Sequence, residues 1–184
     1  MVNEEVYVSV DIEAAGPIPG EYSMLSIGAS FIGEPGVTFY IELKPINGNA
    51  VAEALTLNRL DLVVLARDGE EPTVAMSQLR DWVKGAAAGR RPVFVGFNTG
   101  FDWSFVNWYF HKFLGENPFG FAALDIKSYY MGFSGCAWKQ TTSSQIPGEF
   151  QPDRPNTHNA LDDAIAQGQI FAKLLGARQQ RRGS

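Results

Sequence analysis

The stretch of sequence that decides the fold reads Val6-Tyr7-Val8-Ser9-Val10-Asp11-Ile12-Glu13. Its first five residues are mostly large β-forming side chains and predict a strand, which Gly16 and Pro17 bring to an end. Because side chains two residues apart on a strand point to one face, we expect Asp11 and Glu13 to lie together at the strand end. Two such carboxylates repel each other unless a cation lies between them, although a lone pair of this kind more often decorates an exposed strand end.

The rest of the chain predicts one α/β domain with a central mixed sheet, three antiparallel strands at its N-terminal side and flanking helices. The further expected strands are 24–32, 37–43 and 92–97, with a short strand or helix opening at 124–125, and the expected helices lie within 50–65, 73–88, 102–114 and 159–175. Residues 134–157 are rich in Ser, Thr, Gly and Pro and predict a long loop. We expect a domain core of about 6–175 within 1–184 and a flexible tail over 176–184.

Composition limits the classes of function that this domain can have. Fifteen Lys and Arg against 20 Asp and Glu give a formal charge of −5, which is the wrong sign for a protein that binds long nucleic acid with its whole surface. A single cysteine, Cys136, excludes an intramolecular disulfide, and no apolar run is long enough to cross a membrane. The N-terminal residues do not have the pattern of a secretion signal. The sequence therefore predicts a cytoplasmic protein with no membrane contact.

Two further acidic sites stand where predicted elements begin. Asp102 follows the buried strand 92–97 at the expected start of a helix, where a carboxylate also suits the helix dipole. Near the last helix, Asn159 could cap the N-terminus with Asp162 at its third position, which leaves Asp163 free for another function. His158 and Asp163 are five residues apart, about 140° on a regular helix, so they could meet only if His158 precedes the helix. A histidine there could accept a proton near neutral pH, although a solvent-exposed loop histidine is an equal alternative.

Three segments together resemble the motifs of the DEDDh, or DnaQ-like, family of 3′→5′ exonucleases. They are Asp11-Ile12-Glu13, Asn98-Thr99-Gly100-Phe101-Asp102 and His158-Asn159-Ala160-Leu161-Asp162-Asp163-Ala164. This family includes proofreading subunits, oligoribonuclease and ribonuclease T, so the resemblance implies a ribonuclease H-like fold. It also implies two Mg²⁺ or Mn²⁺ ions held by Asp11, Glu13, Asp102 and Asp163, with His158 as the catalytic base.

The resemblance further implies hydrolysis of single-stranded or short DNA or RNA from its 3′ end, releasing nucleoside 5′-monophosphates. Met24, Leu25, Phe101 and Asn98 are the expected substrate-binding residues, although packing in the core is an equal alternative for the apolar ones. Several relatives dimerise, so a homodimer is also an expectation. The loop 134–157, which carries Trp138, Lys139 and Arg154, could close over the 3′ end.

Two positions differ from the common family pattern, and several functions remain compatible with the motifs. Ala14 stands where many members have Thr, and Phe97 where many have His, which leaves the substrate subclass open. One alternative is a non-catalytic nucleic-acid-binding module with the same fold. Another is a proofreading subunit that relies on a polymerase, and a third is a phosphatase or small-molecule phosphodiesterase with the same chemistry.

Overall fold

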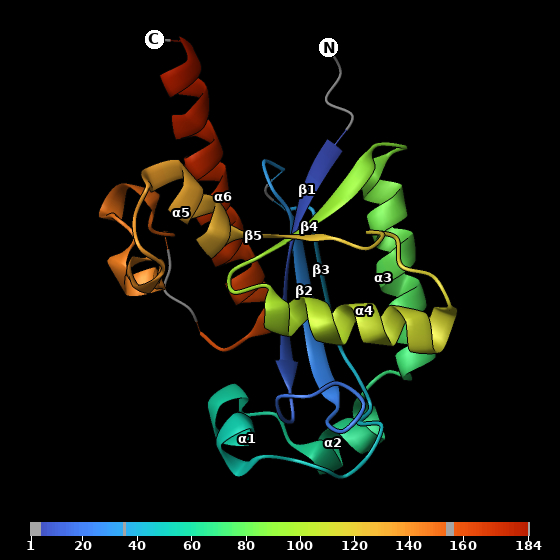
Figure 1. Ribbon diagram of the computed structural model, residues 1–184. Helices are drawn as coiled ribbons and strands as arrows, with labels where there is room; N and C mark the ends of the chain where they lie inside the picture. The colour runs from blue at the N-terminus through green and yellow to red at the C-terminus, as the bar shows by residue number, and fades with distance from the viewer. Residues whose placement is uncertain (1–4, 35, 154–156, 184) are drawn as a thin grey trace.

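The computed structural model describes residues 5–34, 36–153 and 157–183 and contains a five-stranded mixed sheet (Figure 1). The strands are β1 Glu5–Ala14, β2 Met24–Phe31, β3 Thr38–Glu42, β4 Arg91–Gly96 and β5 Ala123–Asp125, in the order β3-β2-β1-β4-β5. The first three are antiparallel, whereas β4 pairs parallel with both β1 and β5. The expected mixed sheet with three antiparallel N-terminal strands is therefore confirmed.

The helices cover both faces of this sheet. They are α1 Ala52–Asn58, α2 Leu62–Asp68, α3 Pro72–Ala87, α4 Gly100–Leu114, α5 Ile126–Ser134 and α6 Ala160–Gly183. On one face α3 and α4 pack against the sheet, and on the other α6 packs mainly on β1 and β2 while α5 lies next to β5. The helices α1 and α2 lie beyond the end of β1, at the bottom of Figure 1.

Alternation along β1 decides which helix layer each side chain faces. Val6, Val8, Val10 and Ile12 are buried in the cluster under α3 and α4, and Tyr7 packs in the cluster under α5 and α6. Since successive side chains on a strand point to opposite faces, the odd-numbered residues of β1 share the face of Tyr7. Asp11 and Glu13 therefore lie on the face that α6 covers.

The approach of α6 to the sheet depends on small residues. A Cβ atom at Gly28 of β2 would lie 2.3 Å from the backbone of Ala160, where α6 begins. One at Gly168 would lie 3.1 Å from the Cβ atom of Ser9 on β1. Because backbone atoms cannot move aside as a flexible side chain can, Gly28 lets the first turn of α6 lie directly on β2. That contact brings the segment 157–163 over the end of β1.

Three segments differ from what the sequence predicts. The helical segment expected within 50–65 is two short helices, because Arg59 adopts a left-handed conformation at φ 59° and ends α1. The segment 134–157 contains three short 3-10 helices, Trp138–Gln140, Ser143–Gln145 and Gly148–Phe150. Residues 176–183, expected as a flexible tail, are the last turns of α6 and project beyond the sheet in Figure 1. Among the described residues, no helix has the length and hydropathy that crossing a bilayer requires.

Candidate active site

Asp11 and Glu13 lie near the C-terminal end of β1, within the strand rather than after it. Asp11 pairs with Gly28 and Glu13 with Ser26 of β2, and the register shifts directly after Glu13. The strand continues to Ala14 because antiparallel pairing with β2 outlasts parallel pairing with β4, which ends at Ser9. Both carboxylates thus lie on a stretch of β1 that is not paired with β4.

Asp102 reaches this stretch from α4. It lies in the first turn of the helix and is 5% exposed, and its Oδ1 accepts a hydrogen bond from the backbone N–H of Ile12 at 3.2 Å. The helix N-cap is Thr99 rather than Asp102, and the Thr99 N–H donates to Asp125 Oδ2 at 3.0 Å. The side chain of Asp102 is therefore attached to β1 between Asp11 and Glu13.

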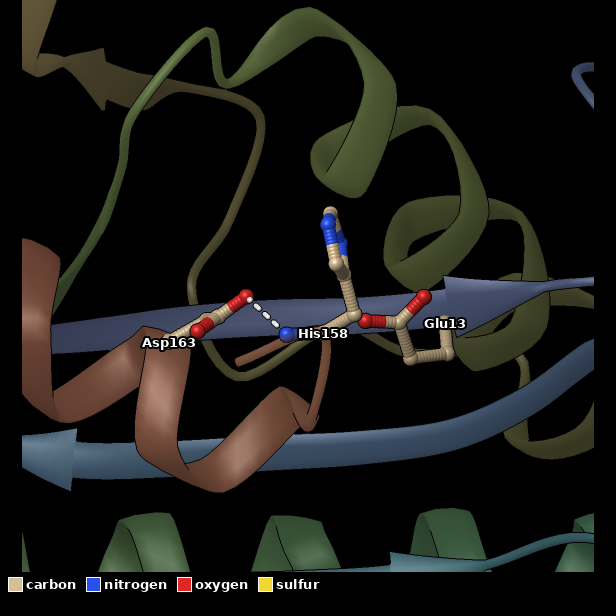
Figure 2. A group of neighbouring side chains, drawn as sticks. All are labelled: Glu13, His158 and Asp163. Atoms are coloured by element: carbon tan, nitrogen blue, oxygen red, sulfur yellow. Dashed lines mark hydrogen bonds between the residues drawn. The ribbon is translucent and has the colours of Figure 1, made fainter. Parts of the chain in front are cut away.

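Asp163 and His158 reach the site from the opposite side. The prediction that His158 precedes the last helix is confirmed, because α6 begins at Ala160 and His158 has a left-handed φ of 58°. Asp163 accepts hydrogen bonds from the backbone N–H groups of Thr157 at 2.8 Å and of His158 at 3.2 Å (Figure 2). Its two oxygens thus hold the preceding segment in a tight turn over the site.

The expected division between the two adjacent aspartates is also seen. Asn159 Oδ1 accepts from the N–H groups of Leu161 at 3.0 Å and Asp162 at 3.2 Å, which is an N-cap for α6. Asp162 is exposed and accepts from the hydroxyl of Thr157 at 3.2 Å. Asp163 is 6% exposed and faces the sheet. Capping therefore separates a structural aspartate from one directed into the site.

The side chains of Glu13, His158 and Asp163 meet in space. Each offers one ligand atom, and these atoms all lie within 4.8 Å of one another. Figure 2 shows Glu13 coming from β1, His158 from the segment before α6 and Asp163 from the first turn of α6. Carboxylate oxygens and an imidazole nitrogen at this separation can coordinate one divalent cation.

The surroundings of Asp11, Glu13 and Asp102 disfavour the ionised form of each carboxylate. Burial, followed by the charges of Asp102, Asp163 and Glu13, raises the pKa of Asp11 well above its usual range. Burial, with the charges of Asp163 and Asp102, raises the pKa of Glu13 to about 8. Burial raises the pKa of Asp102 to about 7, against the opposing effect of the hydrogen bond from Ile12. Without a cation, these groups hold protons at a pH where carboxyls are normally ionised.

Gln167 is a residue of the site that the sequence did not reveal. Its Nε2 donates to the carbonyl of Val10 at 2.9 Å, and its Oε1 accepts from the N–H of Phe97 at 2.5 Å. The side chain is 5% exposed and lies between β1 and the end of β4 where their pairing has stopped. The signal that could have identified Gln167 is a glutamine on the sheet-facing side of α6, where most of the other buried residues are apolar.

The predicted substrate-binding residues fall into two groups. Met24 and Leu25 have 0% exposed area and pack in the core, so we withdraw them as base-stacking residues. Met24 is buried under α3 and α4, where its N–H donates to the hydroxyl of Tyr109, and Leu25 is buried against Leu65 of α2. Phe101 is 38% exposed beside Asp102, and Asn98 is exposed in the turn after β4. Of the lid residues, Trp138 and Lys139 are exposed, whereas Arg154 lies outside the described residues.

Comparisons with known proteins agree with this arrangement. The sequence is 48% identical over 170 residues to a protein of Escherichia coli named 3′-5′ DNA exonuclease Cap18, and the match covers 92% of this chain and 91% of that protein. No protein-family model matches the sequence.

Solved structures share the fold at low sequence identity. The nuclease domain of 3′hExo, described as a DEDDh family member bound to rAMP, superposes with a TM-score of 0.76 at 15% identity, over 94% of this chain and 92% of that chain. Exonuclease I of E. coli in complex with single-stranded DNA gives a TM-score of 0.70 at 16% identity, over 96% of this chain and 41% of that chain.

The relationship with the E. coli exonuclease extends over nearly the full length of both chains. The fold is ribonuclease H-like, and the acidic residues of the three motif segments converge on one face of β1. The chain therefore belongs to the DEDDh family of 3′→5′ exonucleases.

Proposed function

We propose that this exonuclease removes nucleoside 5′-monophosphates from the 3′ end of single-stranded DNA with two bound Mg²⁺ or Mn²⁺ ions. The proposed ligands are Asp11, Glu13, Asp102 and Asp163, and the proposed general base is His158. The observation that carries the proposal is the mutual proximity of four carboxylates, in which the charges of Asp102 and Asp163 help to raise the pKa values of Asp11 and Glu13. Such a group is stable in ionised form only when cations neutralise it.

The donor set fits Mg²⁺ and Mn²⁺. Carboxylate oxygens are the ligands that these hard cations prefer, and no cysteine lies in the group to favour a softer metal. Four carboxylates would balance the charge of two divalent ions. When bound, the cations would lower the pKa of a coordinated water and neutralise charge on the reacting phosphate and the departing 3′-oxygen.

The protein groups hold these ligands in fixed positions. Asp102 is oriented by the N–H of Ile12, and Asp163 by the N–H groups of Thr157 and His158. Backbone donors do not rotate as side chains do, so the carboxylate oxygens are oriented before substrate arrives. His158 is exposed, close to Glu13, and can receive the proton of the attacking water and pass it to solvent.

We propose DNA as the substrate because the relative at 48% identity is named a DNA exonuclease. Phe101 offers an exposed ring next to Asp102, which suits stacking on the terminal base irrespective of sequence. Asn98 lies four residues before Asp102, in the turn beside the site, and has a left-handed φ of 62°. These two residues are the proposed contacts to the 3′-terminal nucleotide.

The test is a time course with 5′-labelled single-stranded DNA and RNA in the presence of Mg²⁺, Mn²⁺ or a chelator. We expect a one-nucleotide ladder on DNA that requires metal. Asp163→Asn should lower the rate roughly a hundredfold or more, the size of effect that follows loss of one electrostatic stabiliser of a transition state.

The matched control is Asp162→Asn, which removes the same charge from the neighbouring residue. Among the described residues, its carboxylate accepts from the exposed hydroxyl of Thr157, so the rate should stay within a few-fold of the wild type. Equal activity of Asp163→Asn and the wild type would refute the ligand assignment. Digestion of RNA alone would refute the proposed substrate, and inactivity of the purified chain on free oligonucleotides would favour a subunit that needs a polymerase.

A further inference from the structure

A cationic and aromatic surface adjoins the proposed active site, and neither its lysine nor its tryptophan has a function in the chemistry described above. It consists of Lys127, near the start of α5, Trp138, which opens the first 3-10 helix, and Asn98 in the turn between β4 and α4. We name these three residues the Lys127–Trp138 shelf. The three segments are brought together because β4 and β5 pair in parallel, which places the turns that follow both strands at one edge of the sheet.

The contacts within the shelf are direct. The ammonium of Lys127 lies 4.4 Å from the centroid of the Trp138 ring, in cation–π geometry. The same ammonium donates to Asn98 Oδ1 at 3.4 Å. Trp138 nevertheless keeps 51% of its surface exposed, so much of the indole remains open to solvent beside the ammonium.

Lys127 has no carboxylate partner among the described residues. In the part of the chain that the structure describes, each ion pair involves another cation, and none involves Lys127. The nearest acid in sequence, Asp125, is occupied with the N–H of Thr99 and the N–H and hydroxyl of Ser128. An ammonium without a carboxylate partner, next to an exposed aromatic ring, is complementary to a phosphate joined to a base.

The position of the shelf relates it to the substrate strand. Asn98 and Asp102 belong to one turn and the helix start that follows it, and Thr99 between them caps α4. The shelf therefore begins where the proposed metal site ends. In a protein with a formal charge of −5, an unpaired cation next to a cluster of acids is a local exception that an anionic strand would use.

We propose that the Lys127–Trp138 shelf binds a nucleotide of the substrate strand on the 5′ side of the nucleotide that is removed. The base stacks on the open part of the Trp138 ring, and its phosphate contacts the Lys127 ammonium. This inference rests on the proposed function, because it takes the strand to end at the four carboxylates. In this proposal a fixed surface binds the strand, and no loop has to close over it.

The test measures KM and kcat on single-stranded DNA over a series of salt concentrations. Trp138→Ala should raise KM at least about fivefold through the lost stacking, with kcat and the salt dependence little changed. Lys127→Gln should make the plot of log(kcat/KM) against log[salt] shallower by about 0.7, the amount expected for one phosphate contact with a single strand. The two variants thus separate the base contact from the phosphate contact.

The chain offers a matched control for each variant. Phe121 is 92% exposed in the loop before β5, at the opposite end of that strand from the shelf, so Phe121→Ala removes an exposed ring of no proposed function. Lys112 is an exposed cation near the end of α4, and Lys112→Gln removes the same charge. Thermal melting of all four variants shows whether any of them unfolds, and a lower melting temperature for Trp138→Ala without a change in KM would mean that the ring only packs.

The outcomes separate this proposal from the proposed function. If Trp138→Ala and Lys127→Gln match their controls while the wild type digests DNA with metal, the shelf proposal is overturned and the proposed function stands. If the wild type produces no metal-dependent shortening, the proposed function fails first. Quenching of tryptophan fluorescence by DNA that disappears in Trp138→Phe would support the stacking contact directly.

Discussion

At the residue scale, the proposed site concentrates groups that destabilise each other in the metal-free protein. Asp11, Glu13 and Asp102 are on or against one short stretch of β1, and burial is the largest cause of the raised pKa of each. Removing carboxylates from water disfavours their charged form, and the neighbouring charges add to that effect. The arrangement is therefore favourable for the ionised protein only when cations are present.

This electrostatic strain predicts a pH dependence opposite to that of ordinary paired carboxylates. The pKa of Glu13 is raised on folding from 4.5 to about 8, so the folded metal-free protein binds more protons than the unfolded chain in this interval. Stability is then fully present below the lower value and is lost as the pH rises through about 8. We expect the melting temperature in chelator to fall over this range, and the stabilisation by Mg²⁺ to grow correspondingly. Differential scanning fluorimetry with and without Mg²⁺ measures both.

Glu13→Gln is the control for this prediction because it removes the titrating group and keeps the shape. In chelator, the variant should lose less stability than the wild type over the same interval. It should also release fewer protons on binding Mg²⁺, as calorimetry in buffers of different ionisation enthalpy would detect. A melting temperature of the metal-free wild type that rises steadily towards pH 8 would contradict the electrostatic account.

At the element scale, the site depends on where β1 and β4 separate. Their pairing ends at Ser9 and Val95, and the side-chain amide of Gln167 then joins Val10 to Phe97 across the gap. The amide forms hydrogen bonds with the carbonyl of Val10 and the N–H of Phe97, which do not pair with each other across the two strands. It thereby sets the spacing between the strand that carries Asp11 and the turn that leads to Asp102.

We expect Gln167→Met to lower the free energy of unfolding by about 1–3 kcal/mol, because a buried donor and a buried acceptor lose their partner. As a positioning residue, Gln167 should affect kcat more than KM, and the apparent affinity for Mg²⁺ should fall as well. Gln169→Met on the same helix is the control. It removes one hydrogen bond, to the exposed N–H of Asp153, and should change stability by less than about 0.5 kcal/mol. Equal effects of the two substitutions on kcat would argue against positioning.

The sequence could predict those elements in which one periodicity governs the whole segment. Alternation in β1 and the apolar spacing of α6 gave the correct element types, and the angle between His158 and Asp163 required the histidine to precede the helix. The longer α6 and the break at Arg59 were not predictable in this way, because helix ends depend on tertiary contacts and on single backbone conformations.

Side-chain roles that depend on contacts between distant segments were the least predictable. Met24 and Leu25 follow a loop near the site, but whether they are exposed depends on how α4 and α2, which are distant in sequence, pack over the start of β2. Gln167 bonds with residues at separations of 70 and 157 positions, which no local pattern encodes. In contrast, the acidic residues of the three motifs could be located because each stands where an element begins or ends.

At the scale of the whole molecule, positive charge is outnumbered by negative charge, and part of it is engaged in ion pairs. Besides the formal charge of −5, ion pairs with carboxylates occupy Lys44, Arg67, Arg80, Lys84, Arg90 and Lys173. Paired cations contribute little attraction to a distant phosphate, and the remaining acidic surface repels it. A homodimer, which would add a second surface, stays a prediction from the family resemblance.

A short footprint on the strand follows from this charge distribution. We expect the affinity for single-stranded DNA to rise with length only to about four to six nucleotides and then to level off, because nucleotides further upstream meet an acidic surface. With two or three phosphates contacted, the slope of log K against log[salt] should not exceed about 2 in magnitude, since each contact to a single strand contributes about 0.7. Titration of 3′-identical oligonucleotides lengthened only at the 5′ end measures the plateau, and the same series at several salt concentrations measures the slope. An affinity that keeps rising with each added nucleotide, together with a steeper slope, would require a basic track in the folded enzyme or in an assembly of two copies, and would shift the explanation of substrate binding from the site to the whole surface.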